Sequence, residues 1–156
     1  MKIEIGSVAP HFSLYSSDKE KISLGDYKNK NVLLLFFPLA FTRVCTKELC
    51  NVRDNISVYN NSKVNVLAIS VDSPQTLAKF KEDQLLNFTL LSDFNKTVSE
   101  EYGCLYEIFS MEMKGVSKRS AFVIDREGIV RYAEVLENAG EEPGYEAIEK
   151  CLEILH

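Results

Sequence analysis

The apolar run Val32–Phe37, which reads V-L-L-L-F-F, limits the possible folds of this chain more than any other stretch. It contains no polar residue and is bounded by Asn31 and Pro38. A short, unbroken apolar run of this kind favours a strand that is buried on both faces of a sheet. Pro38 has no N–H to donate to a strand ladder, so we expect it to end the strand.

A helical pattern follows this strand. Thr42 is a favourable N-cap residue. Apolar residues then recur at helical spacing, at Cys45, Leu49, Val52, Ile56 and Tyr59. Cys45 is therefore expected in the first turn of a helix, where free backbone N–H groups and the helix dipole favour an anion. Because the thiolate is the reactive form of cysteine, Cys45 is a candidate nucleophile.

A single cysteine on an apolar face is more often a small buried core residue. Cys50, five positions after Cys45, argues against that interpretation. On an ideal α-helix, Cα atoms five residues apart are separated by about 8–9 Å, which is beyond disulfide range. A disulfide between these two cysteines therefore requires the helix to unwind, which suits a bond that is made and broken in each catalytic cycle.

Composition argues against several classes of function. A net charge of −5 and a pI near 5.1 argue against nucleic acid or an anionic membrane as a main partner. The longest apolar run is far too short to span a membrane, and the segment Met1–Ile5 has no apolar core typical of a signal peptide. Four cysteines in 156 residues are too few for a disulfide scaffold. We therefore expect a cytoplasmic protein with reduced thiols.

The rest of the chain predicts alternating strands and helices. We expect an N-terminal hairpin (12–15 and 22–24), strands at 64–71 and 88–91, helices at 72–81 and 96–102, an irregular stretch at 105–118, a second hairpin (121–124 and 129–133), and a final helix along Tyr145–Leu155. This order predicts a single domain over residues 1–156. Its fold class is α/β, a thioredoxin-like fold with a mixed central sheet flanked by helices and an N-terminal β-hairpin extension.

The segment P-L-A-F-T-R-V-C, residues 38–45, resembles the active-site motif of the peroxiredoxins. With Cys50, the chain is similar to the bacterioferritin-comigratory, or peroxiredoxin Q, subfamily. Residues 66–72, 86–93 and 118–125 also resemble the family, so the resemblance covers nearly the whole chain. It implies a thioredoxin-dependent peroxidase that reduces hydrogen peroxide and organic hydroperoxides and needs no metal or organic cofactor.

The resemblance also implies the roles of the two cysteines. Cys45 matches the peroxidatic cysteine, whose product is a sulfenic acid. Cys50 matches the resolving cysteine, which forms an intramolecular disulfide with Cys45, and a thioredoxin-like protein then reduces that disulfide. Members of the subfamily occur as monomers and as homodimers, and both states stay open for this chain.

Four further residues match functional positions of the family. Thr42 and Arg119 match the residues that hydrogen-bond the thiolate and the peroxide, and Pro38 matches the proline that shields the pocket. Arg119 directly precedes the strand 121–124, which favours this role over that of a solvated charge. Glu48 matches a position that is often polar in the family and from which it could fix the arginine, and an exposed charge on the helix face is a close alternative for it.

Three residues have no role in this scheme. Arg43 stands where the family usually has proline or a small residue, and we expect its side chain to point into solvent. Cys151 and Cys104 are expected to be packing residues, and Cys104 is the one alternative to Cys50 as a resolving partner.

Two other classes of function compete with the peroxidase. A thiol–disulfide oxidoreductase shares the fold but normally uses a C-x-x-C motif, which this chain lacks. A metal-binding module built on the four cysteines is the other class, but Cys104 and Cys151 form no paired knuckle, and His11 and His156 lack ligand spacing.

Overall fold

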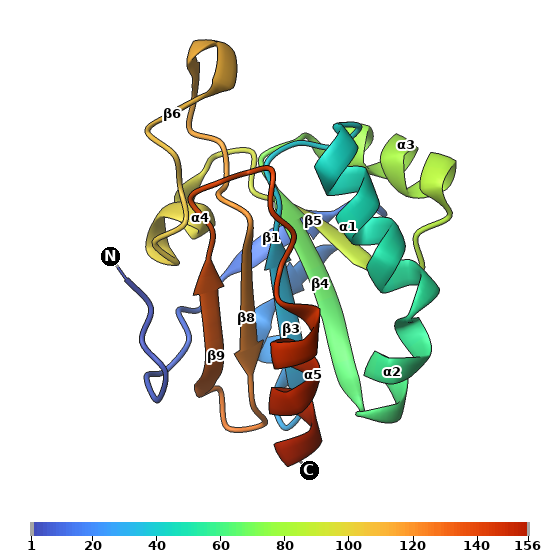
Figure 1. The fold of residues 1–156 in the computed structure, drawn as a ribbon, viewed down its shortest axis with the longest axis vertical. Coiled ribbons are helices and arrows are strands. Elements are labelled where there is room, and N and C mark those ends of the chain that lie inside the picture. The colour runs from blue at the N-terminus through green and yellow to red at the C-terminus, as the bar shows by residue number, and fades with distance from the viewer. Residues whose placement is uncertain (1, 156) are drawn as a thin grey trace.

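A seven-stranded sheet in the order β2-β1-β5-β4-β3-β8-β9 forms the centre of the computed structural model, which describes residues 2–155 (Figure 1). Its strands are β1 (Ser13–Ser16), β2 (Lys21–Ser23), β3 (Asn31–Phe36), β4 (Val64–Ser70), β5 (Thr89–Ser92), β8 (Ser120–Ile124) and β9 (Val130–Val135). β3 runs parallel to β4 and antiparallel to β8. The predicted mixed sheet is confirmed, and strand ends differ from the predictions by one or two residues.

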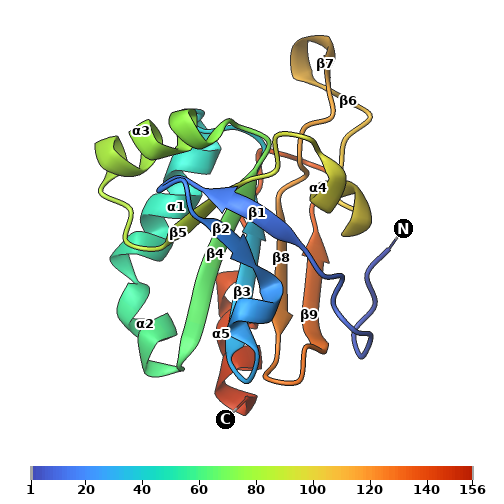
Figure 2. The same cartoon turned by 180° about the vertical axis from the view of Figure 1, so that it is seen from behind.

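Helices cover both faces of the sheet. They are α1 (Arg43–Asp54), α2 (Ile56–Asn61), α3 (Pro74–Gln84), α4 (Thr97–Glu101) and α5 (Tyr145–Ile154), with a short 3-10 turn η1 (Leu24–Tyr27). α1, α2, α3 and α5 contribute buried apolar residues to the core on one face. α4, η1 and the N-terminal segment contribute to the core on the opposite face (Figure 2).

β3 is the buried strand that the apolar run predicts, because each of its six residues is buried. Leu33 and Leu35 belong to the core under α1, whereas Leu34 and Phe36 belong to the core under α4. This alternation follows from the period of two along a strand. Because both faces of β3 are buried, the strand holds the start of the following turn in a fixed position.

The N-terminal hairpin is confirmed. β1 pairs antiparallel with β2, with Ser13 opposite Ser23, and also pairs antiparallel with β5. The hairpin therefore extends the sheet at the edge farthest from β9. Among residues 2–155, no helix combines the length and the apolar character needed to cross a membrane.

The pattern from Cys45 to Tyr59 predicts one continuous helix, and this prediction is wrong. The helix breaks at Asn55, whose ψ is +21°, and α2 begins at Ile56. The side-chain amide of Asn55 donates to the carbonyl of Asn51 at 2.8 Å. Asparagine competes with the helix ladder in this way, which explains the break despite an apolar face that continues through it.

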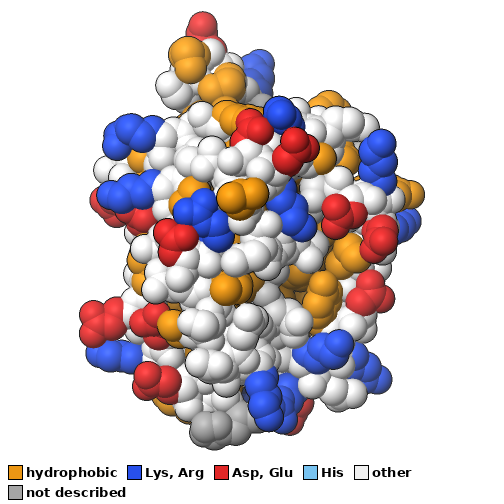
Figure 3. All heavy atoms as spheres, turned by 90° about the vertical axis from the view of Figure 1, so that its right-hand side faces the viewer, with side chains coloured by type: hydrophobic (Ala, Val, Ile, Leu, Met, Phe, Trp, Pro, Cys, Tyr) orange, Lys and Arg blue, Asp and Glu red, His pale blue; other side chains and the backbone are white. Residues whose placement is uncertain are grey.

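The irregular stretch 105–118 contains a small hairpin of its own. It consists of β6 (Ile108–Phe109), the 3-10 turn η2 (Ser110–Glu112) and β7 (Met113–Lys114). The hairpin projects from the body of the molecule and carries apolar side chains at its tip (Figure 3). Met111 is 83% exposed. The hairpin therefore adds little to the core.

Candidate active site

Cys45 lies at the carboxyl end of the central strand, as the third residue of α1. Its side chain is 1% exposed and packs in the core between the sheet and the helices. The prediction of a first-turn cysteine next to a buried strand is confirmed. Burial alone would also fit a packing cysteine, so the polar neighbours of the sulfur decide what it can do.

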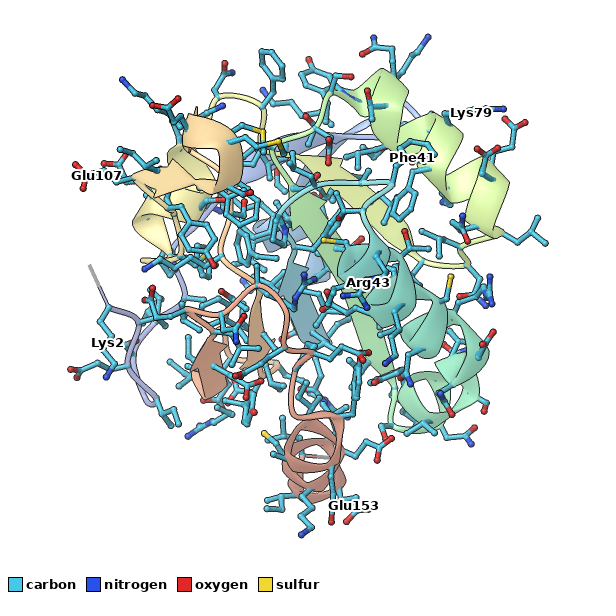
Figure 4. All side chains as sticks on the ribbon, turned by 45° about the horizontal axis from the view of Figure 1, so that its top comes forward. Lys2, Phe41, Arg43, Lys79, Glu107 and Glu153 are labelled. Atoms are coloured by element: carbon cyan, nitrogen blue, oxygen red, sulfur yellow. The ribbon has the colours of Figure 1, made fainter. Side chains whose placement is uncertain are left out.

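The turn between β3 and α1 is held in a defined shape. The N–H of Ala40 donates to Asp72 Oδ2 at 2.8 Å, and the Ser70 hydroxyl donates to the same oxygen at 2.6 Å. Phe41 adopts a positive φ of 67°, which is uncommon for a residue with a side chain. Its ring lies 5.1 Å from that of Phe80 in α3, and Figure 4 shows it between the start of α1 and α3.

Arg119 supplies the charge beside the cysteine. Its Nη1 and Nη2 atoms each donate to Cys45 Sγ at 3.4 Å. The register of β8 on β3 places Ser120 opposite Phe36, which brings Arg119 to the end of the central strand. The side chain is only 1% exposed. The prediction that this arginine leads into the strand beside β3 is confirmed, and a solvated surface position is excluded.

Glu48 and a main-chain carbonyl fix the guanidinium. Arg119 Nη1 donates to Glu48 Oε1 at 2.7 Å, and Nη2 donates to the carbonyl of Ala139 at 2.8 Å. Glu48 is 0% exposed, so the alternative of an exposed helix position is wrong. Burial raises the pKa of Glu48 to about 7, and the attraction of Arg119 offsets this only in part.

Thr42 occupies the N-cap position of α1, as predicted, but its hydroxyl does not cap the helix. The hydroxyl donates instead to the carbonyl of Leu39 at 2.6 Å. Thr42 is exposed, whereas Pro38 is buried directly after β3. Arg43 is exposed on the first turn of α1, in agreement with the prediction (Figure 4).

Cys50 lies five residues after Cys45 within the same intact helix. It is half-buried, and its Sγ donates to Gln84 Oε1 at 3.4 Å. The two thiols therefore have different neighbours, Arg119 for Cys45 and the end of α3 for Cys50. All four cysteines are free thiols in this structure.

The two other cysteines lie away from this site. Cys104 is 0% exposed and belongs to the core on the opposite face of the sheet from Cys45. Burial raises the pKa of Cys104 to about 12. Cys151 packs beside the apolar face of α5. Within residues 2–155, no group of three His, Cys, Asp or Glu side chains is arranged to hold a metal ion.

Two contacts of the site cannot be found from the sequence. Ala139 contributes a main-chain carbonyl, which leaves no residue-type signal. Gln84 contributes a side-chain amide from a segment predicted to lie beyond the end of its helix at about Lys81. α3 in fact continues to Gln84.

The chain matches known proteins over most of its length. The model of the AhpC/TSA family matches residues 5–133. Peroxiredoxin Bcp of Escherichia coli is 39% identical over 132 residues, which cover 83% of this chain and 84% of that protein. Alkyl hydroperoxide reductase E of Mycobacterium tuberculosis is 40% identical over 136 residues, which cover 85% and 86%.

A solved structure gives the same result for the fold. The crystal structure of peroxidoxin BcpB from Mycobacterium tuberculosis superimposes with a TM-score of 0.87 at 26% sequence identity and covers 99% of both chains. The family match, the curated relatives and the fold agree with the Cys45–Arg119 pair at the end of the central strand. The chain therefore belongs to the AhpC/TSA family and is a peroxiredoxin of the Bcp type.

Proposed function

We propose that this protein is a thiol-dependent peroxidase whose nucleophile is Cys45. One observation carries the assignment of the residue: both terminal nitrogens of a buried arginine point at its sulfur. A guanidinium at this distance can donate hydrogen bonds to the sulfur and to an oxygen that reacts with it. An ordinary packing cysteine has no need of a buried cation.

In the first step, the Cys45 thiolate attacks one oxygen of a hydrogen peroxide or organic hydroperoxide molecule. A sulfur–oxygen bond forms, the oxygen–oxygen bond breaks, and the leaving oxygen takes up a proton to become water or an alcohol. Negative charge grows on the leaving oxygen, so hydrogen-bond donors fixed in advance around it lower the barrier. Arg119 and the free N–H groups at the start of α1 are such donors.

Thr42, Pro38 and Glu48 complete the proposed pocket. Thr42 is exposed directly before α1 and would donate to the peroxide once its hydroxyl leaves the carbonyl of Leu39. Pro38 contributes a buried apolar wall. Glu48 holds the guanidinium in orientation through the 2.7 Å contact.

In the second step, Cys50 resolves the sulfenic acid. Its sulfur attacks Cys45, the new sulfur–sulfur bond replaces the sulfur–oxygen bond, and water leaves. Because both cysteines lie in one intact helix, about 8–9 Å apart at their Cα atoms, the first turns of α1 must unwind for this step. A thioredoxin-type dithiol protein then reduces the disulfide. No metal or organic cofactor takes part in either step.

We propose the cytoplasm as the compartment of the enzyme, since thiol reductants are available there. Both cysteines of one cycle come from a single chain, so the mechanism works equally for a monomer and for a homodimer. Neither nucleic acid nor a membrane is proposed as a partner, since the protein carries a net charge of −5.

The test is peroxide consumption with a thioredoxin-type reductant by the wild type and by the Cys45→Ser and Cys50→Ser variants. We expect no turnover from Cys45→Ser. We expect one turnover from Cys50→Ser, which then stops with a sulfenic acid that a sulfenic-acid trapping reagent labels at Cys45. An active Cys45→Ser enzyme would overturn the proposal, and continued turnover of Cys50→Ser with the same reductant would remove Cys50 from the mechanism.

A further inference from the structure

The side chain of Cys50 is hydrogen-bonded to the end of α3. Its Sγ donates to Oε1 of Gln84, the last residue of that helix, at 3.4 Å. The contact joins positions 34 residues apart in sequence. It fixes the thiol on the side of α1 that faces α3, two helices that lie side by side in Figures 1 and 2.

One further hydrogen bond holds the main chain of Gln84, and a second joins Asn87 to α1. Arg53, three residues after Cys50, donates from Nη1 to the main-chain carbonyl of Gln84 at 2.5 Å. The side-chain amide of Asn87 donates to the carbonyl of Arg53 at 3.3 Å. Segment 84–87 is therefore hydrogen-bonded to the C-terminal half of α1, which anchors the main chain of Gln84 there.

The position of Cys50 opposes disulfide formation. Five residues along an α-helix correspond to a rotation of about 140°, so the two thiols point to different sides of α1. Cys45 faces Arg119, whereas Cys50 faces Gln84. To attack the sulfenic acid, the Cys50 sulfur must give up its bond to Gln84 and move around the helix.

We infer that Gln84 is a positioning residue for the resolving step, and that its hold on Cys50 sets the lifetime of the Cys45 sulfenic acid. This inference rests on the proposed function. While the Cys50 thiol stays hydrogen-bonded to Gln84, the sulfenic acid on Cys45 persists. A second peroxide molecule can then oxidise it to sulfinic acid, with loss of water or an alcohol. When Cys50 is released, the sulfur–sulfur bond forms, the sulfur–oxygen bond breaks, and the thiol proton leaves in the water.

The test is the Gln84→Ala variant, in a single turnover started with one equivalent of peroxide. Samples are quenched with a thiol-alkylating reagent, and mass spectrometry counts sulfenic acid and disulfide. We expect disulfide formation to be about two- to tenfold faster than in the wild type, the factor that corresponds to the loss of one hydrogen bond. Sulfenic acid formation should keep its rate within about twofold, because Arg119 is untouched. With excess peroxide, the yield of sulfinic acid should fall.

Two further variants separate positioning from a general loosening of α3. Gln84→Glu keeps an acceptor oxygen at the same reach and should resolve no faster than the wild type. Gln75→Ala makes the same change of residue type in the first turn of α3, where the side chain is exposed, and should leave both rates unchanged.

Three results would overturn the inference. The first is wild-type resolution by Gln84→Ala, and the second is resolution by Gln84→Glu as fast as that by Gln84→Ala. In both cases, the wild type still forms the disulfide between Cys45 and Cys50, so the proposed function stands. The third is a wild type that forms no such disulfide, which overturns the proposed function together with the inference.

Discussion

One buried guanidinium serves two acidic groups in this site. Arg119 donates to both the Glu48 carboxyl group and the Cys45 sulfur, and all three side chains are almost completely buried. A single positive charge cannot fully compensate two negative ones in a region that excludes water. Arg119 therefore divides its hydrogen bonds between the carboxyl group and the sulfur.

For catalysis, the planar set of N–H donors on the Arg119 guanidinium (its fork) should matter more than its positive charge. In Arg119→Lys the charge stays, but one ammonium group cannot reach Cys45, Glu48 and the Ala139 carbonyl together. We expect kcat/KM for peroxide to fall by about 10²–10³-fold, as for the loss of a fixed donor to a developing oxyanion. The measurement is peroxide consumption by the pre-reduced enzyme.

The neighbouring Lys118 provides the control for this variant. Its ammonium group pairs with the exposed carboxylate of Glu137. Lys118→Arg should therefore keep kcat/KM within about twofold, since surface ion pairs contribute little. Equal losses in the two variants would contradict a specific role for the Arg119 fork.

Stability should depend on pH through Glu48. The folded protein raises its pKa from 4.5 to about 7, so the folded state binds this proton more tightly than the unfolded state does. The corresponding stability is fully present below about pH 4.5 and is lost as the pH rises to about 7. Relative to Glu48→Gln, the free energy of unfolding of the wild type should fall by about 2–3 kcal/mol across this range. Urea unfolding of both proteins between pH 4.5 and 8 tests this, and parallel curves would contradict it.

The sequence predicts the positions of some site residues correctly and those of others not at all. Cys45 and Arg119 could be placed, because one follows a recognisable buried strand and the other leads into the adjacent one. The burial of Glu48 could not be predicted, since a carboxylate on a helix is usually solvated and only the three-dimensional contact with Arg119 permits its burial. The N-cap position of Thr42 predicts a hydroxyl that caps the helix, but the turn brings the Leu39 carbonyl within 2.6 Å and the hydroxyl donates to it instead.

At the scale of the secondary-structure elements, the proposed cycle places two conflicting requirements on α1. Its first turn must be intact to present Cys45 to Arg119, and the same turn must open for Cys50 to reach Cys45. The break at Asn55 limits the part that can open to the 12 residues of α1, since α2 packs separately through Tyr59. Residue patterns predicted the start of this helix well and its end poorly.

Oxidation should therefore reduce helicity. When Cys45 and Cys50 form a disulfide, we expect the far-UV circular dichroism to lose signal equivalent to about one to two helical turns. Amide hydrogen exchange should accelerate at the start of α1 and stay slow in α5. Cys50→Ser treated with one equivalent of peroxide is the control and should keep its helical signal. A disulfide-containing protein with unchanged exchange in α1 would contradict the need to unwind.

At the scale of the whole molecule, the sheet separates the thiols. Cys45 and Cys50 belong to α1 on one face, whereas Cys104 is buried in the core of the opposite face. The order of strands and helices predicted this sheet, because buried runs, hairpin turns and helical periods are local signals. Which face each cysteine occupies depends on packing between distant segments, and no local signal gives it.

Cys104 should therefore not replace Cys50. We expect Cys50→Ser, after treatment with peroxide, to contain no disulfide between Cys45 and Cys104 by peptide mass mapping under non-reducing conditions. Cys104→Ser should keep the turnover of the wild type within about twofold. Detection of that cross-sheet disulfide would show that the folded sheet opens far more than α1 does.

The contact between Arg119 and the Ala139 carbonyl has a consequence for the synthesis of the protein. Cys45, Arg119 and Ala139 lie far apart in the sequence, and the chain leaves the ribosome from its N-terminus at about 5–20 residues per second. For several seconds, a nascent chain exposes Cys45 without its cationic neighbour. During that time the residue lacks the environment that activates it, so peroxide in the cell should spare unfinished chains and react with completed ones.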